Sequence, residues 1–340
     1  MEEWQYRFPE ITKAQWLQRI NSDLKGKSIS TLQSEWWPGE VRVPFHHKED
    51  KVDPPVELPA HFFTAAPLLT EWIDTRNRNE TDINKEVLLA LQYGAQSIIL
   101  HVGKDLPSIS KILENVIQDY ISISVESDES LDGIAAYITP NIKTRLQNGQ
   151  SPLHHTSFSK YVYSMSSEGD WTEQTANVLK DILDRWRILN ESGFGSSFLQ
   201  NCILRYTPGT DYLKQIIQTR VIHIVWQRIF TTHNIQPDPS HVYLECHILP
   251  DPQCDPDKYL IQAASSALAA SLTGIHALCI HHMPDQNTAG YYSRINRNIS
   301  HLLHLESEMY KGIDPLAGSY SIDYYTRKWS DDILTKLAFP

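Results

Sequence analysis

The chain has 340 residues, of which 41% are hydrophobic and 21% charged, a composition typical of a soluble globular protein that can bury a large core. Its formal net charge of −11 argues against a nucleic-acid binder. No apolar run approaches the ~18 residues of a membrane span. The N-terminus lacks the basic start of a signal peptide and the four cysteines form no CxxC pair, so we expect a cytoplasmic protein with free thiols.

Residues 1–65 are predicted to form an N-terminal arm, because they show no regular alternation of strands and helices. One amphipathic helix is expected over about Lys13–Leu24, ending near Gly26. The arm also contains four tryptophans and several prolines: Trp4, Trp16, Trp36, Trp37, Pro38, Pro44, Pro54, Pro55 and Pro59. So many tryptophans in a segment without its own core imply packing either on the flank of the main domain or on a partner subunit.

Residues 66–340 alternate short apolar runs with segments of helical period, which predicts βαβ units and a parallel sheet. Seven strands are expected at Trp72–Thr75, Ser97–Val102, Ile121–Val125, Lys160–Met165, Asn201–Tyr206, His241–Ile248 and His276–His282. A weaker eighth is expected around Tyr320–Ile322, and the connection Glu126–Gly149 is predicted as a helix that Pro140 interrupts. Eight such units predict an α/β fold, a (β/α)8 TIM barrel.

The active site of such a barrel lies at the carboxyl ends of its strands. The polar side chains predicted there are Arg76, His101, Ser164, Arg205, His247, His281, His282 and Asp314. Arg205 can anchor an anion, and His247 and His281 can act as acid–base groups or hydrogen-bond donors. A structural role for each of them is an open alternative, because the surrounding sequence matches no P-loop, GxGxxG, HExxH or GxSxG motif.

Three pairs of adjacent histidines occur, at His46–His47, His154–His155 and His281–His282. Neighbouring side chains on a strand point to opposite faces, so two adjacent histidines in a regular β-strand cannot both bind the same metal ion. A metal site would need a second contributing strand and a carboxylate. We therefore expect no metal site.

The segment Asp314–Tyr320 (DPLAGSY) combines a proline, a glycine and small residues, a pattern that fits either a tight structural corner or a turn against a ligand. Together with the upstream Arg294–Asn298 (RINRN) and Glu306–Glu308 (ESE), it resembles in order and spacing the RIARN…EES…DPAGGSYY signature of the methylmalonyl-CoA mutase family. The signature positions carried over are Arg294, Arg297, Asn298, Asp314, Pro315, Gly318, Ser319 and Tyr320. Weaker similarities extend over nearly the whole chain, and the arm resembles the leader of small subunits from heteromeric mutases.

The sequence departs from the catalytic members of that family at the strand ends. Thr75–Asn77 stands where they have RQY, and Tyr163–Gly169 stands where they have YHMQEAG, so an active-site tyrosine and a substrate-binding histidine are missing. Gly274–His281 is closer to the GADAITVL of the non-catalytic small subunit than to the catalytic GTQSLHTN. We find no counterpart of the arginine that holds the substrate carboxylate, and no cobalamin-binding, flavodoxin-like domain with its DxHxxG motif.

The resemblance implies a small-subunit-like component of an adenosylcobalamin-dependent mutase, with a degenerate active site and no confident catalytic residue. We expect a catalytic large subunit as its partner in a heterodimer, with adenosylcobalamin held by the assembled complex rather than by this chain alone. Two alternatives remain open. The first is an acyl-CoA mutase barrel that works with a cobalamin domain on another chain. The second is a barrel repurposed to bind CoA thioesters.

Overall fold

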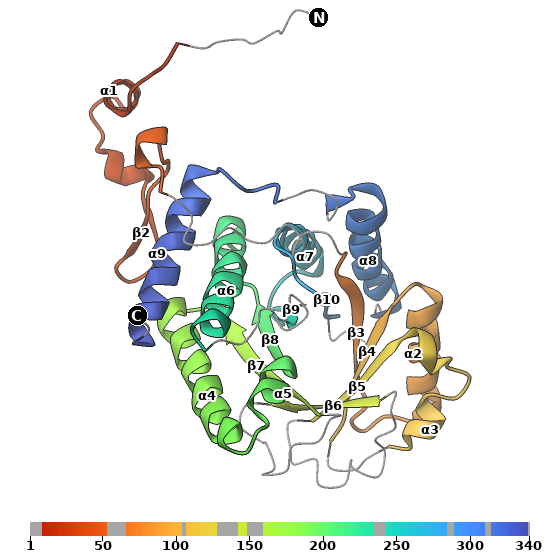
Figure 1. The fold of residues 1–340 in the computed structure, drawn as a ribbon. Helices are drawn as coiled ribbons and strands as arrows, with labels where there is room; N and C mark the ends of the chain where they lie inside the picture. Colours follow the sequence, from red (N-terminus) through yellow and green to blue (C-terminus); the bar gives the residue numbers. More distant parts are fainter. Residues whose placement is uncertain are drawn as a thin grey trace, which may run out of the picture.

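A computed structural model of the chain describes residues 9–52, 66–103, 107–127, 142–147, 159–233, 243–283, 289–309 and 314–338. Eight parallel strands form a closed barrel in the order β10-β3-β4-β5-β6-β7-β8-β9, surrounded by helices (Figure 1). The predicted (β/α)8 barrel is therefore confirmed. Within the described residues, no helix is long and apolar enough to cross a membrane.

The barrel strands are β3 (Leu68–Asp74), β4 (Ser97–His101), β5 (Ser122–Glu126), β6 (Ile142–Gln147), β7 (Ser159–Ser166), β8 (Cys202–Thr207), β9 (Tyr243–Ile248) and β10 (Ala277–Ile280). The helices of the barrel are α2 (Glu80–Gln92), α3 (Ile109–Ile112), η4 (Gln118–Tyr120), α4 (Trp171–Glu191), α5 (Gly195–Gln200), α6 (Tyr212–Thr232), α7 (Pro256–Ser271), α8 (Ala289–His301), the π-helical η7 (Leu302–Glu306) and α9 (Tyr320–Lys336). The arm contains α1 (Lys13–Asp23), η1 (Ile29–Leu32), β1 (Ser34–Trp37), β2 (Glu40–Arg42) and η2 (Lys48–Asp50).

Seven of the predicted strands are confirmed, but the eighth is wrong. Residues 320–322 begin helix α9, because Ile322, Tyr325, Trp329 and Ile333 recur at helical spacing and bury one face. The missing strand is β6, which lies inside the connection predicted as an interrupted helix. Its IKTRLQ sequence contains only two apolar residues, Ile142 and Leu146, and lacks the continuous apolar run that marks most of the other strands.

Aspartates start the long helices on the flank of the barrel where α4, α6 and α7 lie. Asp170, Asp211 and Asp255 are their N-caps, and each side chain accepts hydrogen bonds from backbone amides of the first turn. Asp211 also joins the arm to the barrel, because its second carboxylate oxygen accepts from Trp36 Nε1 at 3.0 Å and from Arg42 at 3.1 Å. One residue thus fixes both the start of α6 and the position of the β1–β2 hairpin.

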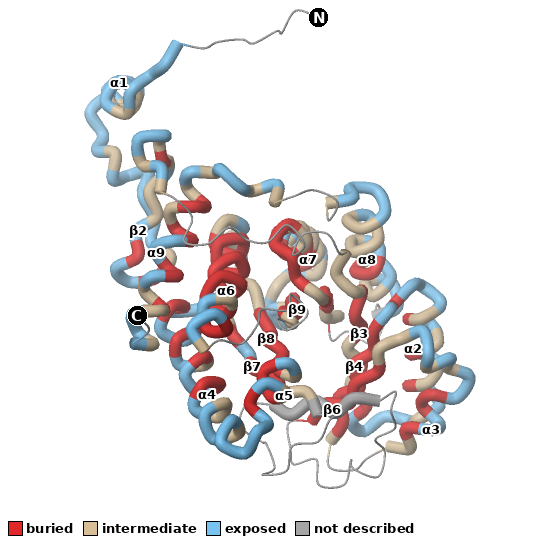
Figure 2. Tube along the Cα trace, viewed as in Figure 1, coloured by how far each residue is buried: buried red, intermediate tan, exposed pale blue. Residues whose placement is uncertain are grey.

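The arm divides into a docked part and a projecting part. Trp36 and Trp37 of β1 pack against Trp329 of α9, and the buried Glu40 of β2 accepts a hydrogen bond from Trp329 Nε1 at 3.0 Å. The helix predicted at Lys13–Leu24 is confirmed as α1, but it buries none of its residues against the rest of the chain. Figure 2 shows α1 exposed beyond the body of the barrel. The hairpin therefore packs on the flank of the barrel, whereas α1 contacts other residues of the arm, with Trp16 stacked on Phe45.

Replacing Trp329 by alanine should lower the free energy of unfolding by about 3–5 kcal/mol, because it removes a fully buried ring from the contact between the arm and the barrel. Equilibrium unfolding in urea measures this loss. Arg327, two residues before Trp329 on the exposed side of α9, gives the matched control: Arg327→Ala should change the unfolding free energy by about 0.5 kcal/mol or less. Equal effects from the two variants would contradict the packing described.

Candidate functional site

The interior of the barrel holds a buried ion network that joins three strands. Arg205 of β8 donates from both terminal nitrogens to the two carboxylate oxygens of Glu126 on β5, at 2.7 and 2.6 Å. Its Nε donates to Glu245 of the neighbouring β9 at 2.7 Å. All three side chains are buried. Because β5 and β8 are separated by two strands, the guanidinium bridges the barrel interior.

The electrostatics of the network hold Arg205 in its charged form. Burial disfavours a charge, but the negative charges and hydrogen bonds of Glu245 and Glu126 outweigh that cost and raise the pKa of Arg205 above its usual value. The guanidinium also lies 5.4 Å from the centre of the Trp72 ring, a cation–π contact. The arginine expected to anchor an external anion is thus already neutralised by carboxylates of its own chain.

Three histidines surround the same tryptophan ring. His101 stacks on Trp72 with ring centres 4.9 Å apart, and the rings of His247 and His281 lie 5.8 and 5.4 Å from it. Nδ1 of His247 is 3.0 Å from Nε2 of His281, and Nε2 of His247 is 3.3 Å from Glu245. Burial, followed by the charges of His247 and Arg205, lowers the pKa of His281 well below its usual value. His281 is therefore a neutral hydrogen-bonding group at physiological pH.

The structure brings four of the eight predicted candidates together around one ring. His101, Arg205, His247 and His281 belong to the network around Trp72. Arg76 lies past the end of β3, where it is exposed and paired with Asp74 at 2.7 Å. Ser164 sits beside Arg205 in the register of β7 and β8, but it is exposed.

Sequence reasoning missed Glu126, Glu245 and Trp72, which organise the site. The signal that marks both glutamates is a carboxylate within or directly after a strand that is otherwise apolar, where burial demands a positive partner. A similar signal marks Glu71 in β3. Reading the buried acids and Arg205 as one set would have predicted an internal ion network.

The residues of the predicted signature make structural contacts outside the barrel interior. Arg297 donates to the buried Glu71 at 2.8 Å, and Arg220 of α6 holds Asp314 through two hydrogen bonds of 2.6 and 2.9 Å. Ser319 is the N-cap residue of α9, and Gly318 adopts a positive φ of 82° in the preceding turn. The other signature positions are exposed: Arg294, Asn298, Pro315 and Tyr320. For the segment Asp314–Tyr320, the geometry therefore favours a tight structural turn over a turn that contacts a ligand.

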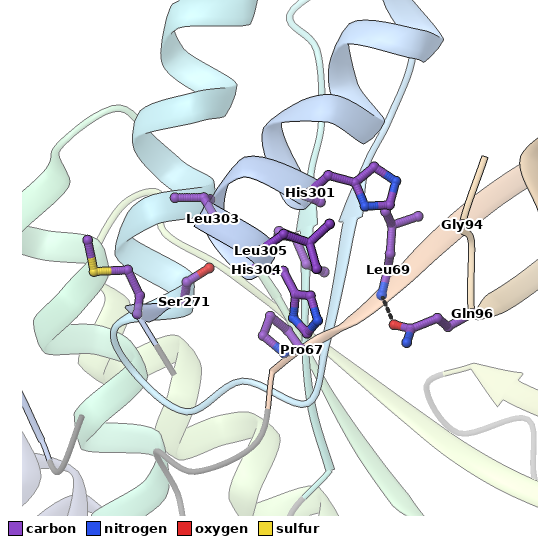
Figure 3. A pocket seen from close by; sticks show the side chains of 12 residues that line it. Pro67, Leu69, Gly94, Gln96, Ser271, His301, Leu303, His304 and Leu305 are labelled. Atoms are coloured by element: carbon purple, nitrogen blue, oxygen red, sulfur yellow. Dashed lines mark hydrogen bonds between the residues drawn. The ribbon is translucent and has the colours of Figure 1, made fainter. Parts of the chain in front are cut away.

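A separate cavity of about 220 Å³ lies away from the ion network (Figure 3). It is lined by Pro67 and Leu69 at the start of β3, by Gln96 just before β4, and by His301 and His304 of α8 and η7. These positions are at the amino ends of the strands, which in TIM barrels is the face associated with stability rather than with chemistry. The cavity therefore does not extend the candidate site.

Comparison with known proteins relates the chain to one family. A sequence profile described as methylmalonyl-CoA mutase matches residues 191–338. The methylmalonyl-CoA mutase small subunit of Porphyromonas gingivalis is 20% identical over an alignment that covers 96% of this chain and 62% of that subunit. The methylmalonyl-CoA mutase of Escherichia coli is 26% identical over 53% of this chain and 26% of its own length. The chain thus spans less than two thirds of either relative.

Solved structures give a weak likeness of fold. Yersinia pestis DHPS with a pterine-sulfa conjugate is 12% identical with a TM-score of 0.39, covering 76% of this chain and 98% of that chain. The 7,8-dihydropteroate synthase of Vibrio fischeri is also 12% identical, with a TM-score of 0.36, covering 72% of this chain and 95% of that chain. Likeness at this level carries no argument about function.

Replacing Arg205 by methionine should lower the free energy of unfolding by about 3–5 kcal/mol, because the guanidinium that compensates two buried carboxylates is removed. Arg76→Met is the matched control, since it breaks an exposed pair with Asp74 that contributes about 1 kcal/mol or less. Chemical denaturation at neutral pH compares the two variants. An Arg205→Met loss no larger than that of Arg76→Met would overturn the structural role of the network.

The stability of the fold should fall on acidification through two histidines outside the network. Burial lowers the pKa of His223 to about 3 and that of His276 to about 4, whereas both take up protons near pH 6.5 when unfolded. Their contribution to the free energy of unfolding is complete above pH 6.5. It is lost as the pH falls toward 4, by about 1.4 kcal/mol per pH unit for each histidine. Urea unfolding between pH 7 and pH 5 should show this slope, and His223→Gln should reduce it. An unchanged slope in that variant would contradict the assignment.

Proposed function

We propose that the chain, which is similar to methylmalonyl-CoA mutases, is the small-subunit-like, non-catalytic component of an adenosylcobalamin-dependent mutase that interconverts methylmalonyl-CoA and succinyl-CoA. It acts by assembly with a catalytic large subunit in a cytoplasmic heterodimer. The proposal rests on its relation to a small subunit and on the state of its own strand ends.

The observation that carries the non-catalytic role is the internal satisfaction of Arg205. An arginine that binds a substrate anion must hold its donors ready for that anion. Here three nitrogens of the guanidinium already donate to Glu126 and Glu245, and its face lies on Trp72. Releasing Arg205 for a substrate would leave buried carboxylates uncompensated, at a cost of several kcal/mol.

The described strand ends are not assigned to adenosylcobalamin. The group would supply a radical when its cobalt–carbon bond breaks, and in the family that the sequence resembles a separate domain with a DxHxxG motif would hold it. The histidines of this barrel interior contact one another and Trp72: His247 lies on His281, and His101 stacks on the indole. We therefore assign the cofactor to the partner and derive no step through it here.

The arm supplies the surface that supports a partner. Helix α1 buries none of its residues, and apolar side chains of the arm are exposed, with Ile11 at 54% and Leu32 at 45%. Trp16 stacks on Phe45 with ring centres 3.8 Å apart, beside a hollow of about 310 Å³ that Leu17 and Ile29 also line. Exposed apolar surface gathered on one projecting element is typical of a protein–protein interface. The catalytic subunit is the occupant that the similarity to mutases favours.

Co-expression of the chain with a catalytic large subunit of a methylmalonyl-CoA mutase, followed by affinity purification, tests this assembly. Leu32→Asp in the arm should weaken binding roughly 10- to 100-fold, the cost of losing one buried leucine contact. Ile188→Asp on α4 is the matched control, because Ile188 is 66% exposed on the barrel rather than on the arm. Equal binding of both variants, or none by the wild type, would argue against docking through the arm.

Turnover assays separate the proposed role from catalysis by this chain. With adenosylcobalamin, the chain alone should not isomerise methylmalonyl-CoA, whereas the assembled pair should. In the pair, Ser164→Ala should leave turnover per complex unchanged, because a strand-end side chain of a non-catalytic barrel touches no substrate. Turnover by this barrel with only a cobalamin domain added would establish it as an acyl-CoA mutase instead. Tight binding of a CoA thioester without turnover or partner would indicate a repurposed barrel.

A further inference from the structure

Two strands place three potential metal ligands side by side at the carboxyl end of the barrel interior. His247 lies on β9, and Cys279 lies opposite it on β10 in the parallel register. His281 follows two residues later, so its side chain points to the same side as that of Cys279. One ligand atom from each residue lies within 4.8 Å of the other two.

We propose that His247, Cys279 and His281 form a binding site for a divalent transition-metal ion, with Zn²⁺ as the preferred occupant. Two imidazoles and one thiolate are ligands that zinc favours over calcium or magnesium. Three protein ligands leave one position of a tetrahedral ion for water, on the side of the barrel interior. The site is independent of the proposed subunit function, since it needs neither cofactor nor partner.

The spacing of the ligand atoms is close to that of a tetrahedral zinc site. With bond lengths of about 2.0 Å to nitrogen and about 2.3 Å to sulfur, ligand atoms lie about 3.3–3.6 Å from one another. Nδ1 of His247 and Nε2 of His281 are 3.0 Å apart, and the remaining distances involving Cys279 are at most 4.8 Å. Small rotations of the side chains are enough to close the set around one ion, without any change in strand register.

Glu245 lies beside His247 at the cluster. Its carboxylate is 3.3 Å from Nε2 of the ring, an ion-pair distance, while Nδ1 lies 3.0 Å from Nε2 of His281. A carboxylate next to the far nitrogen of a histidine is the usual outer contact of zinc-bound imidazole. The carboxylate itself is fixed by Arg205 at 2.7 Å. The ion network thus places a carboxylate beside the first ligand.

The surroundings favour a cation. Among the described side chains that border the cluster, Glu126 and Glu245 outnumber Arg205, so these three carry a net charge of −1 before Cys279 ionises. The ion displaces the thiol proton of Cys279, which leaves to solvent, and it takes the place of the hydrogen bond between the two rings.

The sequence-based objection to a metal site applies only to adjacent histidines. His281 and His282 do point to opposite faces: His282 contacts Glu71 at 3.1 Å, while His281 faces His247. The second strand and the carboxylate that a site requires come from β9, through His247 and Glu245. His281 is also partly exposed, so an ion can reach the cluster from the open end of the barrel.

Titration of the full chain, first stripped by a chelator, with ZnCl₂ in a calorimeter tests the proposal. One ion per chain should bind with a Kd below about 1 μM, and Cys279→Ser should weaken binding about 10- to 100-fold. Cys254→Ser is the matched control, because Cys254 lies outside the cluster and should leave the affinity unchanged. Sub-stoichiometric binding, or equal loss in the two variants, would overturn the site.

Cobalt substitution provides a readout that does not depend on the variants. CoCl₂ added to the wild-type chain should give the intense near-ultraviolet band of a cobalt–thiolate bond together with visible bands of tetrahedral strength. His281→Gln, which changes a partly exposed residue, should weaken the visible bands while circular dichroism shows the fold intact. Absence of the thiolate band in the wild type would rule out Cys279 as a ligand and with it the proposed site.

Discussion

The salt bridge of Arg205 with Glu126 and Glu245 is the constraint on which the barrel interior depends. Burying three charges is tolerable only when each is compensated at close range, so the positions of β5, β8 and β9 are fixed relative to one another. The guanidinium in turn supports the ring of Trp72, against which the interior histidines pack. The strand ends where other barrels bind substrates are therefore filled by mutually dependent groups of this chain.

The same principle explains the contacts made by the signature residues of the C-terminal segment. Arg297 compensates Glu71, and Arg220 compensates Asp314, so two further ion pairs hold α8 and the turn before α9 to the barrel. Loss of either partner would leave a buried or half-buried charge, which is costly wherever the chemistry takes place. A signature made of such contacts indicates how the helices are attached to the barrel. It does not depend on which side chains occupy the strand ends.

Much of the fold could be predicted from sequence because most strands are continuous apolar runs buried on both faces. The exception shows the limit of that signal: β6 has only two apolar residues, whereas the start of α9 resembles a short strand until Trp329 and Ile333 reveal its helical period. The strand-end rule named four residues that lie close together in the structure: His101, Arg205, His247 and His281. It did not predict the ion network, because Glu126 and Arg205 are 79 residues apart and only the closed sheet brings them together.

The interior and the arm place different demands on the chain. In the interior, every buried charge needs a partner of opposite sign. The cluster of His247, Cys279 and His281 lies at the edge of this interior, where β9 meets the four-residue strand β10. An ion bound there would tie these two strands together beside the network of Arg205. The arm, by contrast, is held to the barrel through Asp211 and Trp329, and it exposes Ile11 and Leu32. A barrel whose interior charges are compensated within the chain, and whose arm exposes apolar side chains, is suited to assembly through the arm, since a partner can bind there without entering the interior.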